Sequence, residues 1–391
     1  MSKSVIVIIG YNRLNSLKAC YQAVSRAVYP EEDTVDLIFS LDHSDQEDAI
    51  EQAIRTFGWP HGELRVLKHE ERLGLRKHVV SCGTLVEDYE FLVMLEDDII
   101  VSDSFYLYTR QAAAFYGNDQ RMGGISLYSP HLYPQNGRNF QPEFNGSDTY
   151  MMQVAQSWGQ AWTKSMWEGF YCWYNANQTF EQPSSMPDYA YSWDQRSWLR
   201  YFMGYVCSEN KYLVYPYHSY STNMEDVGEN RKLVDTDYQV ALTSGQKEFH
   251  FLPFERCVRY NGYYEREEDD LFAFRFNGEP VALDLNGTRN RYGNERYIAS
   301  TVSRPFECVA SYGLKMRPQE VNLKYEVSGD EIRIYDRMKP AKAEPVHNME
   351  QVIRYDAKAI SWKRLLYLGA NVAVEENREQ LKKKWKKMRS K

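Results

Sequence analysis

Long hydrophobic runs are absent from this 391-residue chain. No stretch reaches the about 18 consecutive apolar residues that a membrane-spanning helix requires. The one apolar run near the start, residues 5–9, is followed by Gly10 and has no small-residue cleavage site. We interpret it as a buried strand and not as a signal peptide, and we therefore expect a cytoplasmic protein.

Paired cysteines and an excess of positive charge are also absent. The six cysteines are scattered without a Cys-x-x-Cys pair, which fits reduced cytosolic thiols better than a disulfide scaffold or a cysteine zinc site. The net charge of −7 argues against nucleic acid as a partner. There is no internal repeat and no low-complexity linker.

Aromatic residues are abundant, at 15% of the chain with 31 tyrosines. Aromatic faces and hydroxyl groups suit the apolar CH patches and hydroxyls of sugars. A tyrosine-rich structural core would have the same composition, so composition alone leaves both interpretations open.

The first hundred residues alternate between two hydrophobic periodicities. Apolar, β-branched runs typical of buried strands are separated by segments with helical spacing. The strands are predicted at residues 5–9, 36–41, 64–67 and 91–95, and the helices at 15–28 and 77–86. This βαβα order predicts an α/β fold with a Rossmann-like, mostly parallel sheet flanked by helices, whose ligands bind at the carboxyl ends of the strands.

The composition and the hydrophobic pattern change along the chain, and these changes predict three parts. Residues 1–245 form the α/β domain, and its aromatic-rich second half lines the acceptor side of a cleft. Residues 246–340 form a smaller β-rich accessory region, with short strand-like runs at 281–285, 297–302, 321–327 and 331–335. Residues 341–391 are predicted to be helical and end in a basic amphipathic tail.

The strongest chemical signal is the acidic run Glu96-Asp97-Asp98, which follows the predicted strand 91–95. Three adjacent carboxylates would repel one another and lose hydration at the end of a buried strand. A bound Mn²⁺ or Mg²⁺ removes both costs, and such ions prefer one or two carboxylates together with phosphate oxygens and water. A nucleotide diphosphate supplies those oxygens. The alternative is a solvated acidic turn or helix cap.

These residues resemble a known family. Strand-Glu-Asp-Asp-(apolar)₃-Ser-x-x-Phe is similar to the DxD motif of GT-A glycosyltransferases of the N-acetylglucosaminyltransferase I type and related bacterial family 2-like enzymes. Three further segments match in order: Gly10-Tyr11-Asn12-Arg13, the Ser40-Leu41-Asp42 segment, and Ser192-Trp193-Asp194. The resemblance spans about residues 1–230. It departs from the family at Gln195, where a second acid is expected.

The resemblance implies a role for each matching residue. Asp98 binds the metal directly, Asp97 contacts ribose or a metal-bound water, and Glu96 contacts a sugar hydroxyl. On the donor side, Tyr11 and Arg13 lie at the base or phosphate, and Asp42 accepts the uracil N3–H. Asp194 is the general base that takes the proton of the acceptor hydroxyl, so that one displacement inverts the anomeric carbon. The alternative for Asp194 is an ordinary helix N-cap or a buried ion pair.

Three more residues are donor-binding candidates. Arg72 and Lys77 flank Gly74 between the third and fourth strands, where basic groups can neutralise a diphosphate. The alternative for both is a solvated surface turn. Trp162 lies in a segment where GT-A folds place a donor–acceptor loop, and its ring can stack on a sugar or pack in the core.

The tail combines apolar and basic residues. Leu381, Trp385 and Met388 follow i, i+4, i+7 spacing, and residues 381–391 contain seven basic residues and no acid. The pattern predicts a helix lying on anionic lipid, and hence peripheral contact with the inner face of the membrane. A solvated charged terminus is the alternative.

These features favour a metal-dependent, inverting hexosyl- or N-acetylhexosaminyltransferase. We expect it to move a sugar from a nucleotide sugar, with UDP favoured, to a glycan or lipid-linked acceptor in polysaccharide biosynthesis. A sugar-nucleotide nucleotidyltransferase is a second possibility, although it would favour a glycine-rich N-terminal loop and Gly10 stands alone. A non-catalytic carbohydrate-binding protein is a third.

Overall fold

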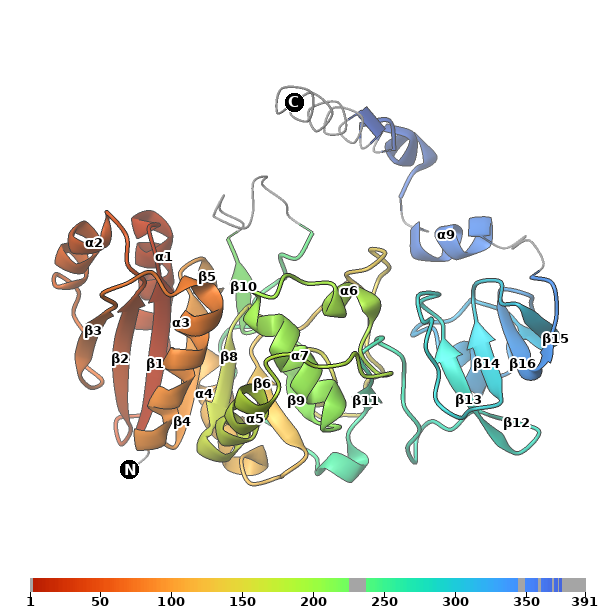
Figure 1. Ribbon diagram of the computed structural model, residues 1–391, viewed down its shortest axis with the longest axis horizontal. Helices are drawn as coiled ribbons and strands as arrows, with labels where there is room; N and C mark the ends of the chain where they lie inside the picture. The colour runs from red at the N-terminus through yellow and green to blue at the C-terminus, as the bar shows by residue number, and fades with distance from the viewer. Residues whose placement is uncertain are drawn as a thin grey trace.

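The computed structural model describes residues 3–224, 237–343, 349–357, 360–367, 369–371 and 373–374. A large sheet dominates the first two thirds of the chain, and a smaller sheet lies in the C-terminal third (Figure 1). The large sheet has nine strands in the order β11-β7-β9-β6-β8-β4-β1-β2-β3. Five of its eight strand pairs are parallel. The predicted α/β fold class is confirmed.

The strands of the large sheet are β1 (Lys3–Gly10), β2 (Thr34–Leu41), β3 (Leu64–Lys68), β4 (Phe91–Glu96), β6 (Met122–Ser126), β7 (Thr149–Met152), β8 (Gln160–Thr163), β9 (Tyr212–Pro216) and β11 (Arg259–Tyr260). The helices of this part are α1 (Leu14–Ser25), α2 (Glu47–Ile54), α3 (Gly74–Gly83), α4 (Phe105–Tyr116), α5 (Lys164–Ala176), α6 (Asp188–Tyr191) and α7 (Trp198–Ser208), with 3-10 turns at Thr84–Asp88 and Phe254–Arg256. Strands β1, β2 and β4 are nearly wholly buried, as their continuous apolar runs predict. Strand β3, at the edge of the sheet, is only partly buried.

The order of the strands reverses next to β1. The chain runs from β1 to β2 and β3 on one side, and then returns to place β4 on the other side of β1. In the β1–β4 pair, Ile9 lies opposite Glu96, so the carboxyl ends of these two strands meet at one edge of the sheet. Open α/β sheets bind ligands at such a reversal point, outside the carboxyl ends of the strands.

Helices cover both faces of the large sheet (Figure 1). On one face, α3, α5 and α7 contact one another. On the other face, α4 packs beside the end of α1, where the rings of Tyr29 and Tyr106 lie 4.9 Å apart and Tyr106 hydrogen-bonds to Ser4 of β1 at 3.0 Å. One continuous apolar core therefore lies under both layers.

A small two-stranded sheet follows the acidic run. Strand β5 (Ile99–Val101) pairs in antiparallel fashion with β10 (Ser221–Asn223). Asn223 lies opposite Ile99, and the amide of Met224 donates to the carbonyl of Asp98 at 2.9 Å. The turn that carries the acids is thus fixed from a second, distant segment.

The C-terminal part has its own sheet, in the order β12-β13-β14-β16-β15, and its own core. Its elements are β12 (Arg275–Phe276), β13 (Glu279–Asp284), β14 (Tyr297–Ser300), β15 (Phe306–Tyr312), α8 (Val321–Lys324), β16 (Ile332–Pro340) and α9 (Met349–Ala357). The core of the large sheet extends to Tyr264 and this second core begins at Phe272, which puts the division between them after the predicted boundary at residue 245. The shift arises because β11 completes the large sheet.

The two parts are joined by hydrogen bonds between buried and half-buried groups. The Tyr260 hydroxyl donates to Glu320 at 2.7 Å, and the Tyr133 and Thr288 hydroxyls lie 2.8 Å apart. Asn136 donates to the carbonyl of Asn286 at 2.9 Å. These contacts fix the β-rich region against the large domain.

Two sequence predictions concern the C-terminal part of the chain: a strand at residues 321–327 and a basic helical tail at 381–391. Residues 321–327 are predicted as a strand, but the first four of them form the helix α8. The chain turns at Pro318, where the amide of Val321 donates to the Pro318 carbonyl at 3.2 Å, and the helix continues from this turn. The basic tail at 381–391 lies outside the described residues. Within the described ranges, no helix combines the length and the apolarity needed to cross a bilayer.

Gly83 lets α3 and α5 pack closely, so its substitution tests the packing of this face. A Cβ at this position would lie 1.9–2.2 Å from three atoms of the Trp167 ring. We expect Gly83→Ala to lower the free energy of unfolding by about 1–3 kcal/mol, the usual cost of overpacking. Thermal and urea denaturation measure this. Gly58→Ala is the control, since its Cβ would meet no heavy atom within 4 Å; equal stability of the two variants would contradict the packing.

Candidate functional site

Arg13 and the acidic run form one cluster at the carboxyl edge of the large sheet. Arg13 follows β1, and its guanidinium contacts both oxygens of Asp97 through Nη2 and Nε. Its Nη1 donates to Asp98 at 2.9 Å. One cation thus bridges two consecutive carboxylates that end the adjacent strand. The structure brings together the residues that the sequence placed at the ends of two strands.

Burial and charge determine the ionisation of this cluster. Burial raises the pKa of Asp97 to about 6 against the opposing effect of Arg13, so this carboxyl stays ionised at neutral pH. Burial and repulsion by Asp98 and Asp97 raise the pKa of Glu96 well above its usual value. Burial alone would lower the pKa of Arg13, but the two aspartates outweigh it and raise that pKa. The cluster keeps a net negative charge that Arg13 only partly offsets.

Asp42 follows β2 and is buried, with 4% of its surface exposed. Its carboxylate accepts the backbone amides of His43 at 3.0 Å, Leu73 at 2.7 Å and Gly74 at 2.9 Å. It therefore holds the start of α3 against the end of β2, which is the role of a helix cap. The amides of His43 and Leu73 both bond to Oδ1, and that of Gly74 bonds to Oδ2, so one lone pair of Oδ2 can accept another hydrogen bond.

The basic residues around α3 occupy different positions. The guanidinium of Arg72 lies over the ring of Tyr11, 4.7 Å from its centroid, so these two candidates form one pair beside the end of β1. Lys77 lies further along α3 and is exposed. Arg76, between them, donates to the carbonyl of Gln195 at 2.9 Å and to the Tyr201 hydroxyl at 2.6 Å.

Asp194 lies in the turn that precedes α7, and Arg76 connects this turn to α3. The Asp194 side chain is 57% exposed. Its carboxylate accepts the backbone amide of Arg196 at 2.7 Å and the guanidinium of Arg196 at 3.0 and 2.9 Å. These hydrogen bonds lower the pKa of Asp194 to about 2. The carboxylate is ionised, but Arg196 must turn away before the carboxylate can accept a proton efficiently.

Trp162 does not lie at the cluster. It is 1% exposed and opposite Leu92, in the amino-terminal half of β4, and its ring packs against Trp167, Trp198 and Phe202. Of the two interpretations of Trp162, the structure supports core packing. A ring enclosed on all sides has no free face for a sugar.

A divalent metal fits the donor groups of the cluster. Within the described residues there is no group of three or more His, Cys, Asp or Glu side chains arranged to hold a metal. Mg²⁺-type sites, however, use one or two protein carboxylates and complete their shell with phosphate and water. Asp98 has one oxygen with no hydrogen-bond partner in the described part of the chain, and the buried Asn223 beside Ile99 has an unpartnered Oδ1 there.

Sequence reasoning missed several groups of this edge. Arg76, Asn223 and Gln160 belong to it, and both polar atoms of the buried Gln160 lack partners among the described residues. Behind Asp42, the Ser40 hydroxyl lies 2.7 Å from Nε2 of His78, whose pKa burial lowers to about 4. A polar residue inside an apolar run, as at Ser40, was the available signal. The Arg76 and Asn223 contacts join distant segments and leave no local pattern.

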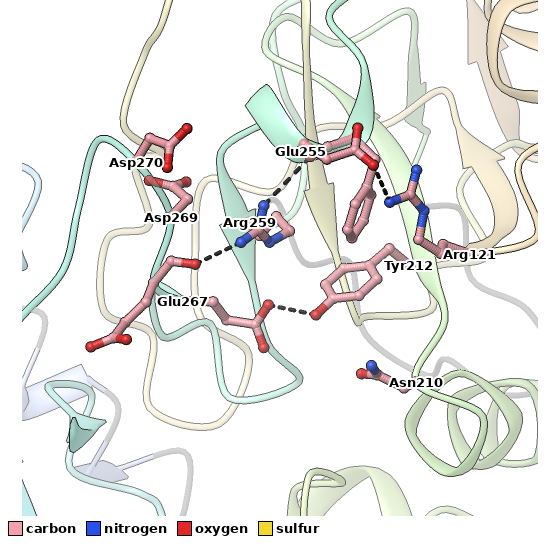
Figure 2. Close-up of a pocket in the computed structure, with 10 residues that line it drawn as sticks. Arg121, Asn210, Tyr212, Glu255, Arg259, Glu267, Asp269 and Asp270 are labelled. Atoms are coloured by element: carbon pink, nitrogen blue, oxygen red, sulfur yellow. Dashed lines mark hydrogen bonds and ion pairs between the residues drawn. The ribbon is translucent and has the colours of Figure 1, made fainter. Parts of the chain in front are cut away.

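A separate cleft of about 510 Å³ lies at the opposite, amino edge of the sheet (Figure 2). Tyr212 begins β9 and Arg121 precedes β6, so both line the end of the strands that is remote from the acidic run. Several of its polar and charged groups pair with one another. Arg121 pairs with Glu255 at 2.5 Å, Tyr212 donates to Glu267 at 2.5 Å, and Arg259 donates to the backbone of this cleft.

Comparison with known proteins gives a partial structural likeness. No family model matches the chain, and neither does any curated protein. Similar solved structures include S. aureus TarS 1-349 in complex with UDP-GlcNAc, at 15% identity and a TM-score of 0.37, covering 59% of this chain and 60% of that one. The mannosyltransferase PcManGT from Pyrobaculum calidifontis in complex with GDP-Man and Mn²⁺ has 16% identity and a TM-score of 0.29, covering 42% and 45%. GalNAc-T7 with UDP, GalNAc and Mn²⁺ has 12% identity and a TM-score of 0.37, covering 56% and 43%. The chain thus spans less than two thirds of each of these structures.

The contact between Arg13 and the aspartates predicts a metal-dependent stability. Arg13→Gln leaves Asp97, which is 4% exposed, without its counter-charge, and removing one partner of a buried pair costs up to about 3–5 kcal/mol. We expect a lower melting temperature that Mn²⁺ raises again, because the dication replaces the lost charge. Differential scanning calorimetry with and without Mn²⁺ measures both effects.

Arg121→Gln is the matched control for this experiment. Arg121 also bridges two carboxylates, those of Asp119 and Glu255, but at the opposite edge of the sheet. Its loss should not produce a Mn²⁺-dependent recovery. An equal response of both variants to Mn²⁺ would show that the ion does not bind at the acidic run.

Proposed function

We propose that the chain is a metal-dependent glycosyltransferase of the GT-A type that uses a nucleotide-sugar donor. One observation carries the proposal. At the reversal point of the sheet, Arg13 from the end of β1 bridges Asp97 and Asp98 from the end of β4. A nucleotide diphosphate is bound by cationic side chains and by a divalent metal ion that carboxylates hold. This edge offers both a guanidinium and carboxylates.

The donor would lie along the carboxyl ends of β1, β2 and β4. Arg13 and the Arg72–Tyr11 pair would bind the phosphates and the base, and Lys77 would add positive charge at longer range. Asp42 would accept the N3–H of uracil through the remaining lone pair of its Oδ2, which favours a UDP-sugar. Glu96 and Asp97 would contact the sugar and the ribose.

Asp98 would hold the Mn²⁺ or Mg²⁺ ion. The unpartnered oxygen of Asp98 and the hard-ligand chemistry of the neighbouring carboxylates support this assignment. When bound, the ion supplies positive charge to the diphosphate that leaves. The protein's own contribution is to hold the carboxylates in place through Arg13 and through the pairing of β5 with β10.

In the proposed transfer, an acceptor hydroxyl oxygen attacks the anomeric carbon as the bond from that carbon to the diphosphate oxygen breaks. The bonding electron pair leaves with the diphosphate, and the hydroxyl proton passes to a carboxylate on the acceptor side. Asp194 is our candidate for that carboxylate, because Arg76 connects its turn to α3 beside the donor side. Attack opposite the leaving group inverts the configuration.

The acceptor would be a glycan or a lipid-linked saccharide, and the sugar a hexose or an N-acetylhexosamine. Product analysis separates the proposed transfer from the other functions that the sequence allowed. Release of a nucleoside diphosphate from a UDP-sugar supports glycosyl transfer, whereas release of pyrophosphate supports a nucleotidyltransferase. Binding of sugar without either product supports a carbohydrate-binding protein.

The metal assignment is tested at Asp98. Asp98→Asn should weaken Mn²⁺-dependent binding of UDP by at least about tenfold, or about 1.4 kcal/mol, while Arg13 still pairs with Asp97 and preserves the fold. Isothermal titration of UDP with and without Mn²⁺ gives the difference. Asp88→Asn is the control, since Asp88 is an exposed aspartate just before the other end of β4. Unchanged UDP affinity in Asp98→Asn would exclude Asp98 as the ligand.

The general base is tested at Asp194. Asp194→Asn should bind UDP and metal normally, since Asp194 acts on the acceptor, and kcat should fall by about 10²–10⁴. The melting temperature should change little, because the pair with Arg196 is exposed. Single-turnover rates measure the loss.

Two outcomes distinguish the roles of the Asp194 turn. Near-normal turnover in Asp194→Asn would redirect the assignment to Asp188, which lies in α6 and is also exposed. Arg196→Gln should keep kcat or raise it, since the substitution frees the Asp194 carboxylate. A kcat loss in Arg196→Gln as large as in Asp194→Asn would indicate that the ion pair itself is required.

A further inference from the structure

The last described helical segment has an uncovered apolar surface. Residues 362–367, 369–371 and 373–374 are helical, and every one of them is exposed. Trp362, Leu366 and Tyr367 are 66%, 63% and 72% exposed. Figure 1 shows this part of the chain as a helix standing apart from both sheets. Large apolar side chains gathered in this way mark a contact surface and not ordinary surface scatter.

The spacing of Trp362, Leu365 and Leu366 places these three side chains on one side of the helix, whereas Tyr367 and Val374 lie away from it. Trp362, Leu365, Leu366, Gly369 and Ala373 follow i, i+3, i+4, i+7 and i+11 positions, which form a single stripe on a helix. The polar residues Arg364 and Asn371 lie on the opposite side of the same helix. The segment is therefore amphipathic.

The charge of the segment identifies the class of partner. Residues 360–374 contain Lys363 and Arg364 and no acidic residue, whereas the whole chain is acidic, at −7. The Lys363 ammonium lies 5.7 Å from the centre of the Trp362 ring, so cation and aromatic occupy the same border of the stripe. Trp and Tyr beside Lys and Arg are typical of helices that lie in the interface of an anionic bilayer.

We propose that residues 360–374 dock the protein on an anionic lipid surface, with the Trp362–Leu366 stripe in the acyl boundary and Lys363 and Arg364 at the headgroups. The proposal goes beyond glycosyl transfer and does not depend on it. It also does not depend on residues 381–391, whose sequence contains seven basic residues that would add to the attraction of an anionic surface.

Vesicle co-sedimentation of the full chain tests the proposal. The wild type should bind vesicles of equal parts phosphatidylglycerol and phosphatidylcholine at least tenfold more tightly than pure phosphatidylcholine vesicles. Trp362→Ser/Leu366→Ser should lose at least tenfold of the binding to the anionic vesicles, although every basic residue remains. The double variant should keep the melting temperature of the wild type, because both side chains are exposed.

Tyr325→Ser/Met338→Ser is the matched control. It removes two large side chains that are 63% and 73% exposed, but from the C-terminal β-rich region, and it should bind vesicles as the wild type does. Equal vesicle binding by both double variants would overturn the proposal. Sedimentation velocity without lipid gives the other decisive outcome: a wild-type oligomer that Trp362→Ser/Leu366→Ser converts to monomer would make this surface a contact between copies of the chain, and would also overturn it.

Discussion

The arrangement of the proposed site depends on the balance of charge between Arg13 and the acids that end β4. Three consecutive carboxylates cannot stay ionised together at the end of a buried strand without a cation. Parallel pairing of β1 with β4 brings the two strand ends together, and the loop after β1 supplies the guanidinium. Because Arg13 offsets only part of the charge, the edge remains electronegative, and this is the basis for the cation site proposed there.

The amino and carboxyl edges of the large sheet differ in how their polar groups are paired. At the amino edge, the cleft in Figure 2 is also rich in charge, and several of its groups pair within the protein, as in Arg121–Glu255 and Tyr212–Glu267. At the carboxyl edge, orphaned atoms remain on the buried Asn223 and Gln160 among the described residues. A buried polar atom without a partner is costly in a folded protein, so such atoms indicate where an external group is expected.

The sequence allowed the prediction of features that depend on local order along the chain. The apolar runs of β1, β2 and β4 and the acids after β4 are periodic or contiguous, so the sheet and the position of Arg13 and the acids at its carboxyl edge followed from them, whereas the ion pair between them did not. What the sequence did not reveal depends on contacts between distant segments. The aromatic core encloses Trp162, and Asp42 is occupied by the amides at the start of α3. The late boundary between the two cores has the same origin, since it depends on β11 joining a sheet begun more than two hundred residues earlier.

The place of β8 in the sheet affects the order in which the protein can form during synthesis. Strands β1 to β4 emerge first, but the outer edge of β4 is completed only by β8, whose residues Gln160–Thr163 come after a long intervening stretch. Until then the nascent chain presents an apolar strand edge beside its acidic turn, and open edges of this kind pair readily with other chains. The acids after β4 therefore have a second consequence: their mutual repulsion between neighbouring nascent chains opposes edge-to-edge association during the interval in which the ribosome has not yet supplied the covering strand.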